Sequence, residues 1–566
     1  MTQTTTPARP KRAAKPNGQW KIDGTTPLNA NEEMKAADNG LNVRQRIEEV
    51  YSVQGFDSID PDDLHGRFRW WGLYTQRAQG IPGGKTATLS PEELEDRYFM
   101  LRVRIDGGAL STQQLRVIGG ISTDFARDTA DFTDRQNIQL HWVDVVDVPE
   151  IWRRLESVEL NTTEACGDVP RVILGSPVAG IAAEEIIDPT PIIAEIARRY
   201  VGNPEFANLP RKFKTAISGH PSQDVVHEIN DIALIGIVHP ELGPGYDLWV
   251  GGGLSSNPRL GERLGAFVSQ EQAPDVWEGV TSIFRDYGFR RLRNRARLKF
   301  LLAEWGTEKF RQVLQDEYLG YALPDIAPGP QPLTAGDHSG VHPQKDGKFF
   351  IGLTPEAGRS SGTTLTALAD LLEAHGSTRL RTTPHQKVIA LDIAEDQVQS
   401  FVGAARALGL EAHPGLLRRS AIACTGIEYC KLAIVDTKNT TIQAVREIES
   451  RLRDHEGKLP KALSMHVNGC PNSCARVQTA DLGFKGQLIT NDAGEQVSGF
   501  QVHLGGTLAG FENGEASLGR TVRGLKVAAD ELPDYVERVV KSYSTLANDG
   551  ESFAAWAHRA AEEDLS

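Results

Sequence analysis

Four cysteines in two close pairs are the residues of this sequence best suited to chemistry. Cys424 and Cys430 have five residues between them, and Cys470 and Cys474 have three. Four thiolates in two pairs can hold a four-iron cluster, with one sulfur for each iron. Zinc sites usually place two to four residues between paired cysteines, so the first gap fits zinc poorly. Disulfides need an oxidising compartment. The spacing therefore favours an iron–sulfur cluster, with zinc and structural thiols as alternatives.

Composition places the chain among cytoplasmic globular proteins. It has 566 residues, 40% hydrophobic and 24% charged residues, and a net charge of −14. No apolar run reaches the length of a membrane span, and the first residues lack the apolar core of a secretory signal. An organelle transit peptide is an alternative that the acidic stretch 21–49 disfavours. Because phosphate backbones attract basic surfaces, the acidic balance argues against nucleic-acid binding. We expect a cytoplasmic monomer with no membrane or nucleic-acid partner.

The second half of the sequence repeats the first. A strand, a helix and a strand are predicted at 98–105, 111–121 and 132–143, and again at 348–353, 363–375 and 379–390. Larger segments at 212–254 and 463–508 are also similar. Residues 1–40 are expected to be a mobile arm, and the Pro/Gly-rich stretch 323–343 a linker between the halves. This repetition predicts gene duplication with pseudo-twofold packing, so that a cofactor between the halves would contact both.

Isolated basic residues begin several predicted apolar strands. Any one of them is more often a solvated surface charge than part of a site. Their recurrence at strand starts in a duplicated fold instead indicates a site for an anion, because Arg and Lys bind carboxylates and oxyanions. These residues are Arg102, Arg104, Arg135, Arg171, Arg211, Lys212 and Lys214.

The pattern C-x5-C followed by N-G-C-x-N-S-C resembles the ferredoxin-dependent sulfite and nitrite reductases, from about Arg67 to Lys541. The resemblance implies a [4Fe-4S] cluster coupled to a sirohaem, and reduced ferredoxin as the electron donor. It makes Cys474 the bridge from the cluster to the haem iron. The implied cluster ligands are Cys424, Cys430, Cys470 and Cys474.

The resemblance also implies the fold. The expected class is α+β, an internally duplicated, three-domain sirohaem reductase fold with pseudo-twofold symmetry. We expect an N-terminal arm with lead-in helices (1–66) and a first ferredoxin-like half-domain (67–165). A sirohaem- and substrate-binding domain (166–325) follows. The linker with the second half-domain (326–415) and a cluster- and sirohaem-binding domain with C-terminal helices (416–566) complete the chain.

Site residues follow from the same resemblance. Around the substrate, the implied cations are Arg102, Arg171, Lys212 and Lys214. The implied haem contacts are Arg135, Gln139, Arg297, Gln386 and Cys474. Nitrite-specific relatives tend to carry Asn at the position of Lys214, so we expect an assimilatory sulfite reductase that makes sulfide with six electrons. The alternatives are a nitrite reductase that makes ammonium and, more distantly, a non-catalytic iron–sulfur or zinc protein.

The fifth cysteine lies outside the cluster motif. Cys166 alone is more often a small buried hydrophobe. Some family members join a cysteine here to a tyrosine by a thioether bond, and the matching pair, Tyr74 and Cys166, is present. No nucleotide-binding glycine motif follows a predicted strand. Electrons must therefore come from a separate protein, and an acidic ferredoxin would need a local basic patch on this acidic chain.

Overall fold

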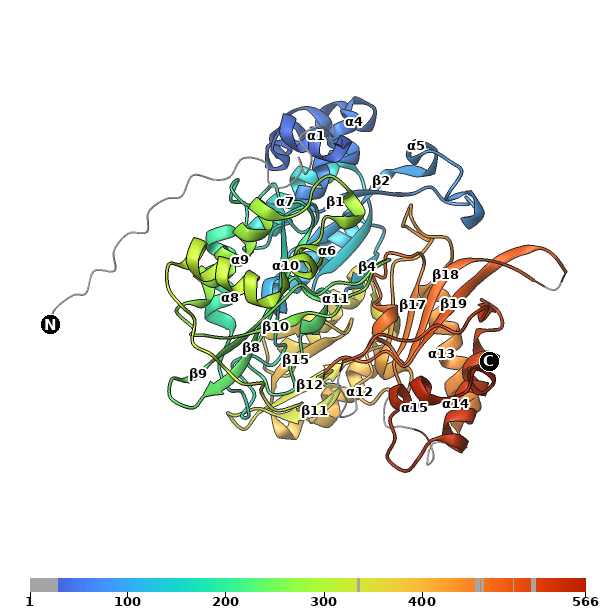
Figure 1. The fold of residues 1–566 in the computed structure, drawn as a ribbon. Coiled ribbons are helices and arrows are strands. Elements are labelled where there is room, and N and C mark those ends of the chain that lie inside the picture. The colour runs from blue at the N-terminus through green and yellow to red at the C-terminus, as the bar shows by residue number, and fades with distance from the viewer. Residues whose placement is uncertain (1–28, 333–335, 454–458, 460–462, 492, 510–515) are drawn as a thin grey trace.

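Two interlocked sheets form the central part of the protein in the computed structural model, which describes residues 29–566 except 333–335, 454–458, 460–462, 492 and 510–515 (Figure 1). All neighbouring strands in both sheets are antiparallel. The first sheet has the order β1 (Leu73–Arg77), β2 (Glu95–Val103), β5 (Ile138–Val143), β4 (Ala130–Phe132) and β13 (Arg359–Ser360). The second has the order β11 (Gly340–Pro343), β12 (Phe349–Leu353), β15 (Val388–Ile393), β14 (Arg379–Thr382) and β3 (Ala109–Ser111).

Each of these sheets takes its last strand from the other repeat. Strand β13 pairs with β4, and β3 pairs with β14. The helices α6 (Thr112–Phe125) and α11 (Gly362–Ala374) pack closely, because a Cβ at Gly119 would lie 2.8 Å from the carbonyl oxygen of Gly362. One hydrophobic core runs through both repeats. The two short repeats therefore fold as one unit.

Two further sheets carry the larger repeats. One has the order β10 (Glu262–Val268), β9 (Gly243–Val250), β8 (Ile232–His239), β7 (Phe213–Ser218) and β6 (Pro170–Gly175). The other has the order β16 (Ala421–Ala423), β17 (Met465–Asn468), β18 (Leu482–Thr490), β19 (Gln496–Leu504) and β20 (Lys526–Ala528). In both, two parallel pairings precede the antiparallel ones. This shared topology confirms the predicted duplicated α+β fold.

Helices cover the larger sheets on separate cores (Figure 1). The β6–β10 sheet packs with α8 (Thr190–Tyr200), α9 (Ala273–Tyr287) and α10 (Leu298–Val313). The β16–β20 sheet packs with α13 (Lys438–Leu452), α14 (Leu532–Leu546) and α15 (Phe553–Arg559). The remaining α-helices are α1 (Ala30–Ala37), α2 (Val43–Arg46), α3 (Ser52–Gln54), α4 (Pro61–His65), α5 (Pro91–Leu94), α7 (Val148–Glu156) and α12 (Val398–Ala407). The exact domain boundaries stay predictions.

Three expectations about local structure were wrong. The segments 132–143 and 379–390 are not single strands. Each contains a turn, with Gln136 and Gln386 both at φ 56°. Apolar residues alternate on both sides of each turn, so the sequence pattern predicted one continuous strand instead of two strands joined by a turn. Part of the expected mobile arm is helical: α1 is anchored by Lys35, whose buried Nζ donates to the Leu209 carbonyl at 2.8 Å. Residues 1–28 lie outside the described residues.

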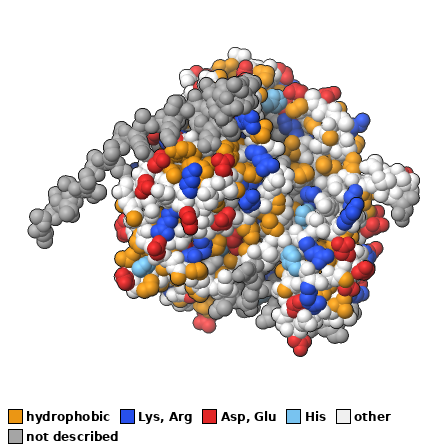
Figure 2. Space-filling view, viewed as in Figure 1, with side chains coloured by type: hydrophobic (Ala, Val, Ile, Leu, Met, Phe, Trp, Pro, Cys, Tyr) orange, Lys and Arg blue, Asp and Glu red, His pale blue; other side chains and the backbone are white. Residues whose placement is uncertain are grey.

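The linker ties the two halves together where it is described. Asp337 is buried between the second repeat's Lys387, at 2.5 Å, and Arg419, at 2.9 Å. The adjacent His338 contacts Asp224 of the first half at 2.7 Å. On the face drawn in Figure 2, acidic and basic side chains are interspersed. Among the described helices, none has both the length and the low polarity that crossing a bilayer requires.

Candidate active site

A cavity of about 1050 Å³ lies where the halves meet, and it contains most of the predicted site residues. Residues from the first sheet and from the two larger sheets line this cavity. Thirteen Lys and Arg line this cavity against four Asp and Glu, in a chain whose net charge is −14. The anion-attracting charge is therefore concentrated inside the protein. The predicted residues in its wall are Tyr74, Arg102, Arg135, Gln139, Arg171, Lys212, Lys214, Arg297, Gln386, Cys424, Cys430, Cys470 and Cys474.

The two cysteine pairs lie on neighbouring loops at one side of the cavity. Cys424 follows β16, and Cys470 follows β17, which is parallel to β16. The Gly469 amide donates to the Cys424 sulfur at 3.2 Å. The Ile434 amide donates to the Gly469 carbonyl at 2.8 Å and so joins the loops. The fold thus brings together the two pairs that the sequence separates by 39 residues.

The sulfur positions suit a cluster better than a single zinc ion. Sulfurs around one zinc lie about 3.8 Å apart, since each zinc–sulfur bond is about 2.3 Å long. Among the described residues, the only three-residue group with ligand atoms all within 4.8 Å of one another is His220, Asp224 and His338. No disulfide joins any of the five cysteines. Burial and the neighbouring cysteines raise the pKa of Cys424 to about 12, so its thiolate form would need a bound metal to be stable near neutral pH.

Two arginines in the cavity wall, Arg102 and Arg171, donate hydrogen bonds to the segment that carries Cys166. Arg102 Nη1 donates to the Cys166 sulfur at 3.0 Å, and its Nη2 donates to Gln139 Oε1 at 2.9 Å. Arg171 Nε and Nη1 donate to the carbonyls of Ala165 and Gly167, both at 3.0 Å. Arg102 Nε is buried and has no hydrogen-bond partner within the described part of the chain. These contacts fix the guanidinium planes.

Lys214 on β7 and Lys212, which directly precedes this strand, line the cavity. Neither Lys212 Nζ nor Lys214 Nζ has an ion-pair or hydrogen-bond partner within 4 Å among the described residues. Burial, together with Lys214 and Arg211, holds the pKa of Lys212 well below its usual value. Burial, followed by Arg135 and Arg297, lowers the pKa of Lys214 to about 7. An anion bound here would relieve this repulsion and raise both pKa values.

Asn230 and Asp231, which directly precede β8, bind two further arginines of the cavity wall. Asn230 Oδ1 accepts from Arg135 Nη1 at 2.7 Å. Asp231 accepts from Arg297 at 2.8 and 3.1 Å and from the Lys214 amide at 2.8 Å. Burial lowers the pKa of Arg135 to about 9. These contacts could not be predicted from the sequence, because Asn230 and Asp231 belong to a different element from the residues they bind.

Gln386 lies in the cavity wall, but its amide is engaged by the protein. Its Nε2 donates to the Ala423 carbonyl at 2.8 Å, and its Oε1 accepts from the Ala423 amide at 3.2 Å. Gln136, at the equivalent turn of the first repeat, binds the Gly175 backbone in the same way at 2.9 and 3.0 Å. Gln386 therefore positions β16, the strand that directly precedes Cys424, and its direct contact with a cofactor stays a prediction.

The sequence also gave no sign of a charged triad in the wall. Lys438 pairs with Asp131 at 2.9 Å, and His141 lies 3.4 Å from the same carboxylate. The His141 ring stacks on Tyr429 with centroids 3.8 Å apart. Tyr429 directly precedes Cys430, so this group supports the first cysteine loop. Its members come from both halves, and no local spacing could have revealed it.

Cys166 lies close enough to Tyr74 to affect the ionisation of the phenol. Burial, followed by the neighbouring Cys166, raises the pKa of Tyr74. Cys166 is fully buried. A thioether would replace one tyrosine C–H and the cysteine S–H by a C–S bond, with two electrons and two protons passing to an oxidant such as dioxygen.

We predict that the bond forms. Tryptic peptides that contain Tyr74 and Cys166 should then co-migrate as one species that resists thiol reductants. Its mass should be lower than the sum of the peptides by two hydrogen atoms. Phe at position 74 should abolish the linked species, since the phenol is needed to activate the ring. Separate, unmodified peptides from the wild-type protein would contradict the prediction.

The cavity as a whole suits a large polyanion adjoining a metal cluster. Two family models match the chain: the nitrite and sulphite reductase 4Fe-4S domain, at 166–323 and 415–565, and the nitrite/sulfite reductase ferredoxin-like half domain, at 92–158 and 342–408. The chain belongs to this nitrite and sulfite reductase family. Each model matches twice, which agrees with the duplicated fold, and the 4Fe-4S domain supports an iron–sulfur cofactor.

Individual relatives distinguish two branches of the family. The chain is 56% identical to a sulfite reductase [ferredoxin] of Mycolicibacterium paratuberculosis, over 99% of this chain and 100% of that protein. It is 34% identical to a ferredoxin–nitrite reductase of Synechococcus elongatus, over 91% of this chain and 96% of that protein. The solved structure of Mycobacterium tuberculosis NirA protein is 55% identical and superposes with a TM-score of 0.94, covering 97% of this chain and 99% of that one.

Proposed function

We propose that this protein is an assimilatory sulfite reductase that converts sulfite to sulfide with six electrons from reduced ferredoxin. The observation that carries the proposal is the single cavity in which four cysteines face a wall of cations. The higher identity to sulfite reductases than to nitrite reductases supports this choice of substrate. The second candidate, reduction of nitrite to ammonium, would use the same cavity, and Lys214 argues against it.

Sirohaem is the cofactor we propose for the cationic part of the cavity. Its carboxylates need several Arg and Lys, and the cavity offers thirteen. Arg135 and Arg297 would hold carboxylates, and Cys474, exposed toward the cavity, would join the cluster to the haem. When bound, sirohaem supplies an iron centre at which an anion can be reduced beside the cluster.

The chain's own cations would hold the substrate and deliver protons. Lys212 and Lys214 have no counter-ion among the described residues, so their ammonium groups can attract an oxyanion. Arg102 and Arg171 are already fixed by hydrogen bonds, so they offer ordered donors at low entropic cost. Three oxygens leave sulfite as water, and the lysine ammonium groups can pass protons to them and be reprotonated from solvent.

Cofactor analysis of the purified protein tests the proposal most simply. We expect four cluster irons and one sirohaem iron for each chain, four acid-labile sulfides, and an extractable sirohaem. Iron without sirohaem would contradict the catalytic assignment. A protein with zinc in the cysteine site and no iron would remove both the sulfite and the nitrite reductase assignments.

The proposed electron donor makes a prediction about ionic strength. The loop that carries Cys430 lines the cavity, and its Leu432 is 61% exposed. An acidic ferredoxin steered by nearby cations should associate more slowly as salt is added, because exposed charges are screened. Turnover with reduced ferredoxin should therefore fall as salt rises, and NADPH alone should support none. Stopped-flow association rates at several salt concentrations measure this effect. Rates that do not depend on salt would contradict electrostatic docking.

A further inference from the structure

The first half of the protein contains a counterpart of the cysteine loops. In the β6–β10 sheet, Thr215 pairs with Ile173 and Ile232. In the β16–β20 sheet, Met465 pairs with Ala421 and Leu482 in the same parallel arrangement. Thr215 is therefore equivalent to Met465, and Ile173 to Ala421. Positions the same number of residues after these reference residues are equivalent in the two halves. Ser176 takes the place of Cys424, Ala182 that of Cys430, His220 that of Cys470, and Asp224 that of Cys474.

Backbone hydrogen bonds confirm this equivalence. The Ser176 amide donates to the Ile217 carbonyl at 3.2 Å, and the Cys424 amide donates to the Val467 carbonyl at 3.1 Å. The loops are also joined alike. The bonds Ile186 to Gly219 and Ile434 to Gly469 both measure 2.8 Å. The first half thus keeps the loop geometry of the cluster site but has nitrogen and oxygen donors in place of sulfur.

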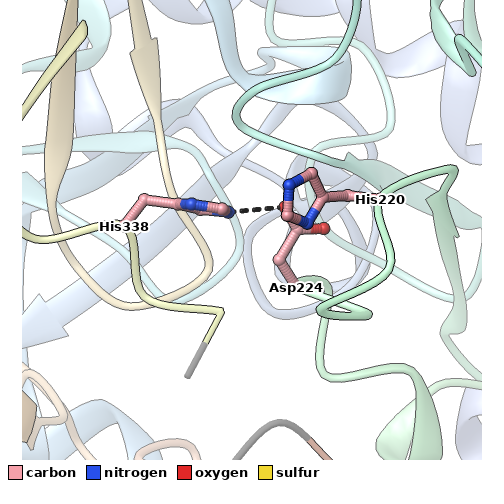
Figure 3. Close-up of side chains that lie close together, drawn as sticks. All are labelled: His220, Asp224 and His338. Atoms are coloured by element: carbon pink, nitrogen blue, oxygen red, sulfur yellow. Dashed lines mark hydrogen bonds and ion pairs between the residues drawn. The ribbon is translucent and has the colours of Figure 1, made fainter. Parts of the chain in front are cut away.

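A residue of the linker completes this counterpart site. His338 Nε2 lies 2.7 Å from Asp224 Oδ2, although 114 residues separate them in the sequence. Figure 3 shows His338 approaching from the linker side and His220 and Asp224 from the opposite side. One ligand atom from each of the three lies within 4.8 Å of the others. A Cβ at Gly336 would lie 2.7 Å from the Asp224 Cα, so glycine allows this close approach.

Hydrogen bonds from neighbouring side chains orient two of the potential ligands, Asp224 and His220. Ser176 and Ser218 donate to Asp224 at 2.8 and 2.7 Å. Ser222 Oγ lies 2.7 Å from His220 Nδ1, which leaves Nε2 facing Glu184 at 3.2 Å. Metal-bound histidines and carboxylates are held by such outer hydrogen bonds, which set ring orientation and tautomer. Glu184 or a water molecule could supply a fourth ligand.

We propose that His220, Asp224 and His338 bind one divalent cation of the zinc type between the first half and the linker. Two imidazoles and a carboxylate suit zinc, and four-coordination is its usual geometry. A second iron–sulfur cluster is excluded here, because none of the four equivalent positions carries a thiolate. The site is separate from the catalytic cavity, none of whose lining residues it uses. Its metal would fasten the linker to the first half.

Metal content of the complete protein with its iron cofactors tests the proposal. After incubation with zinc chloride and desalting, the wild type should retain one zinc for each chain. His338→Gln and Asp224→Asn should each lower the retained zinc about tenfold or more, because each removes a ligand. His413→Gln, which changes an exposed histidine elsewhere, is the matched control and should retain the zinc. Equal zinc in all four proteins, or none in the wild type, would overturn the proposal.

X-ray absorption at the zinc edge gives a second readout that needs no variant to fold. Zinc at this site should show nitrogen and oxygen neighbours at about 2.0–2.1 Å and no sulfur. A sulfur shell at about 2.3 Å would place the zinc among the cysteines and contradict the proposal. Sirohaem absorption of each variant, measured alongside, shows whether the catalytic cavity is intact.

Discussion

Cys474→Ser should abolish sulfite reduction, with kcat falling by about a thousandfold or more, which is about 4 kcal/mol of transition-state stabilisation. Cys474 is exposed toward the cavity and lies on the loop that carries Cys470. In the proposed account it ligates the cluster and joins it to the haem. A serine oxygen is a harder and more basic ligand than a thiolate, so it matches iron–sulfur chemistry poorly.

The spectrum separates this role from a merely structural one. The visible absorption of the haem should change in Cys474→Ser, since the residue proposed to join the haem to the cluster is lost, even in molecules that retain the cluster. Thermal unfolding and acid-labile sulfide should be measured on the same preparation. An unchanged haem spectrum together with wild-type activity would show that Cys474 is not the bridge.

Lys214→Asn should lower the sulfite kcat/KM by one to two decades, at about 1.4 kcal/mol for each decade. Sulfite is largely a dianion near neutral pH, whereas nitrite carries one negative charge. Lys214 lies in a partly desolvated wall beside Lys212, where a second ammonium favours the more highly charged anion. Asparagine keeps a hydrogen-bonding group but removes this charge and a proton donor. Nitrite reduction should suffer less or improve.

An alternative role for Lys214 is to pair only with a haem carboxylate. In that case the variant would lose haem occupancy and both activities in proportion. Both rates should therefore be expressed for each mole of bound sirohaem. Lys309→Asn removes one exposed charge on α10, outside the cavity wall, and serves as the matched control. An unchanged sulfite-to-nitrite ratio in Lys214→Asn would remove our reason for preferring sulfite.

The pH profile gives an independent check on Lys214. Burial and neighbouring cations lower its pKa to about 7, and a bound polyanion would raise it. The ammonium form is the one that binds the anion, and it is lost as pH rises through this pKa. The wild-type sulfite kcat/KM should therefore decline on the alkaline side. The Asn variant should lack that decline.

Spacing along the chain was enough to predict the cluster and the duplication. Cys424 to Cys474 and the repeated strand–helix–strand units are local patterns, and the fold preserves them. The cations on β2, β6 and β7 were also recognisable, because isolated charged residues on apolar strands are unusual. Whether each one contacts the cofactor or substrate is a prediction that the proposed experiments address.

Long-range partners could not be predicted from the sequence. The bond between the Gln386 amide and Ala423 was not predicted, because a tight turn at positive φ brings Gln386 to β16; its contact with a cofactor stays a prediction. The pairing of Lys438 with Asp131 joins residues from different halves. His220, Asp224 and His338 likewise meet only after the linker folds back. Such contacts depend on tertiary packing, so they cannot be predicted from the periodicity of the sequence.

A direct comparison of the two anions tests the central claim. Steady-state kcat/KM should be measured for sulfite and for nitrite with the same reduced ferredoxin, for each mole of bound sirohaem. We expect sulfite to be preferred by at least about tenfold, or about 1.4 kcal/mol, with sulfide as the six-electron product. A preference for nitrite, with ammonium as the product, would contradict the assignment of this protein as a sulfite reductase.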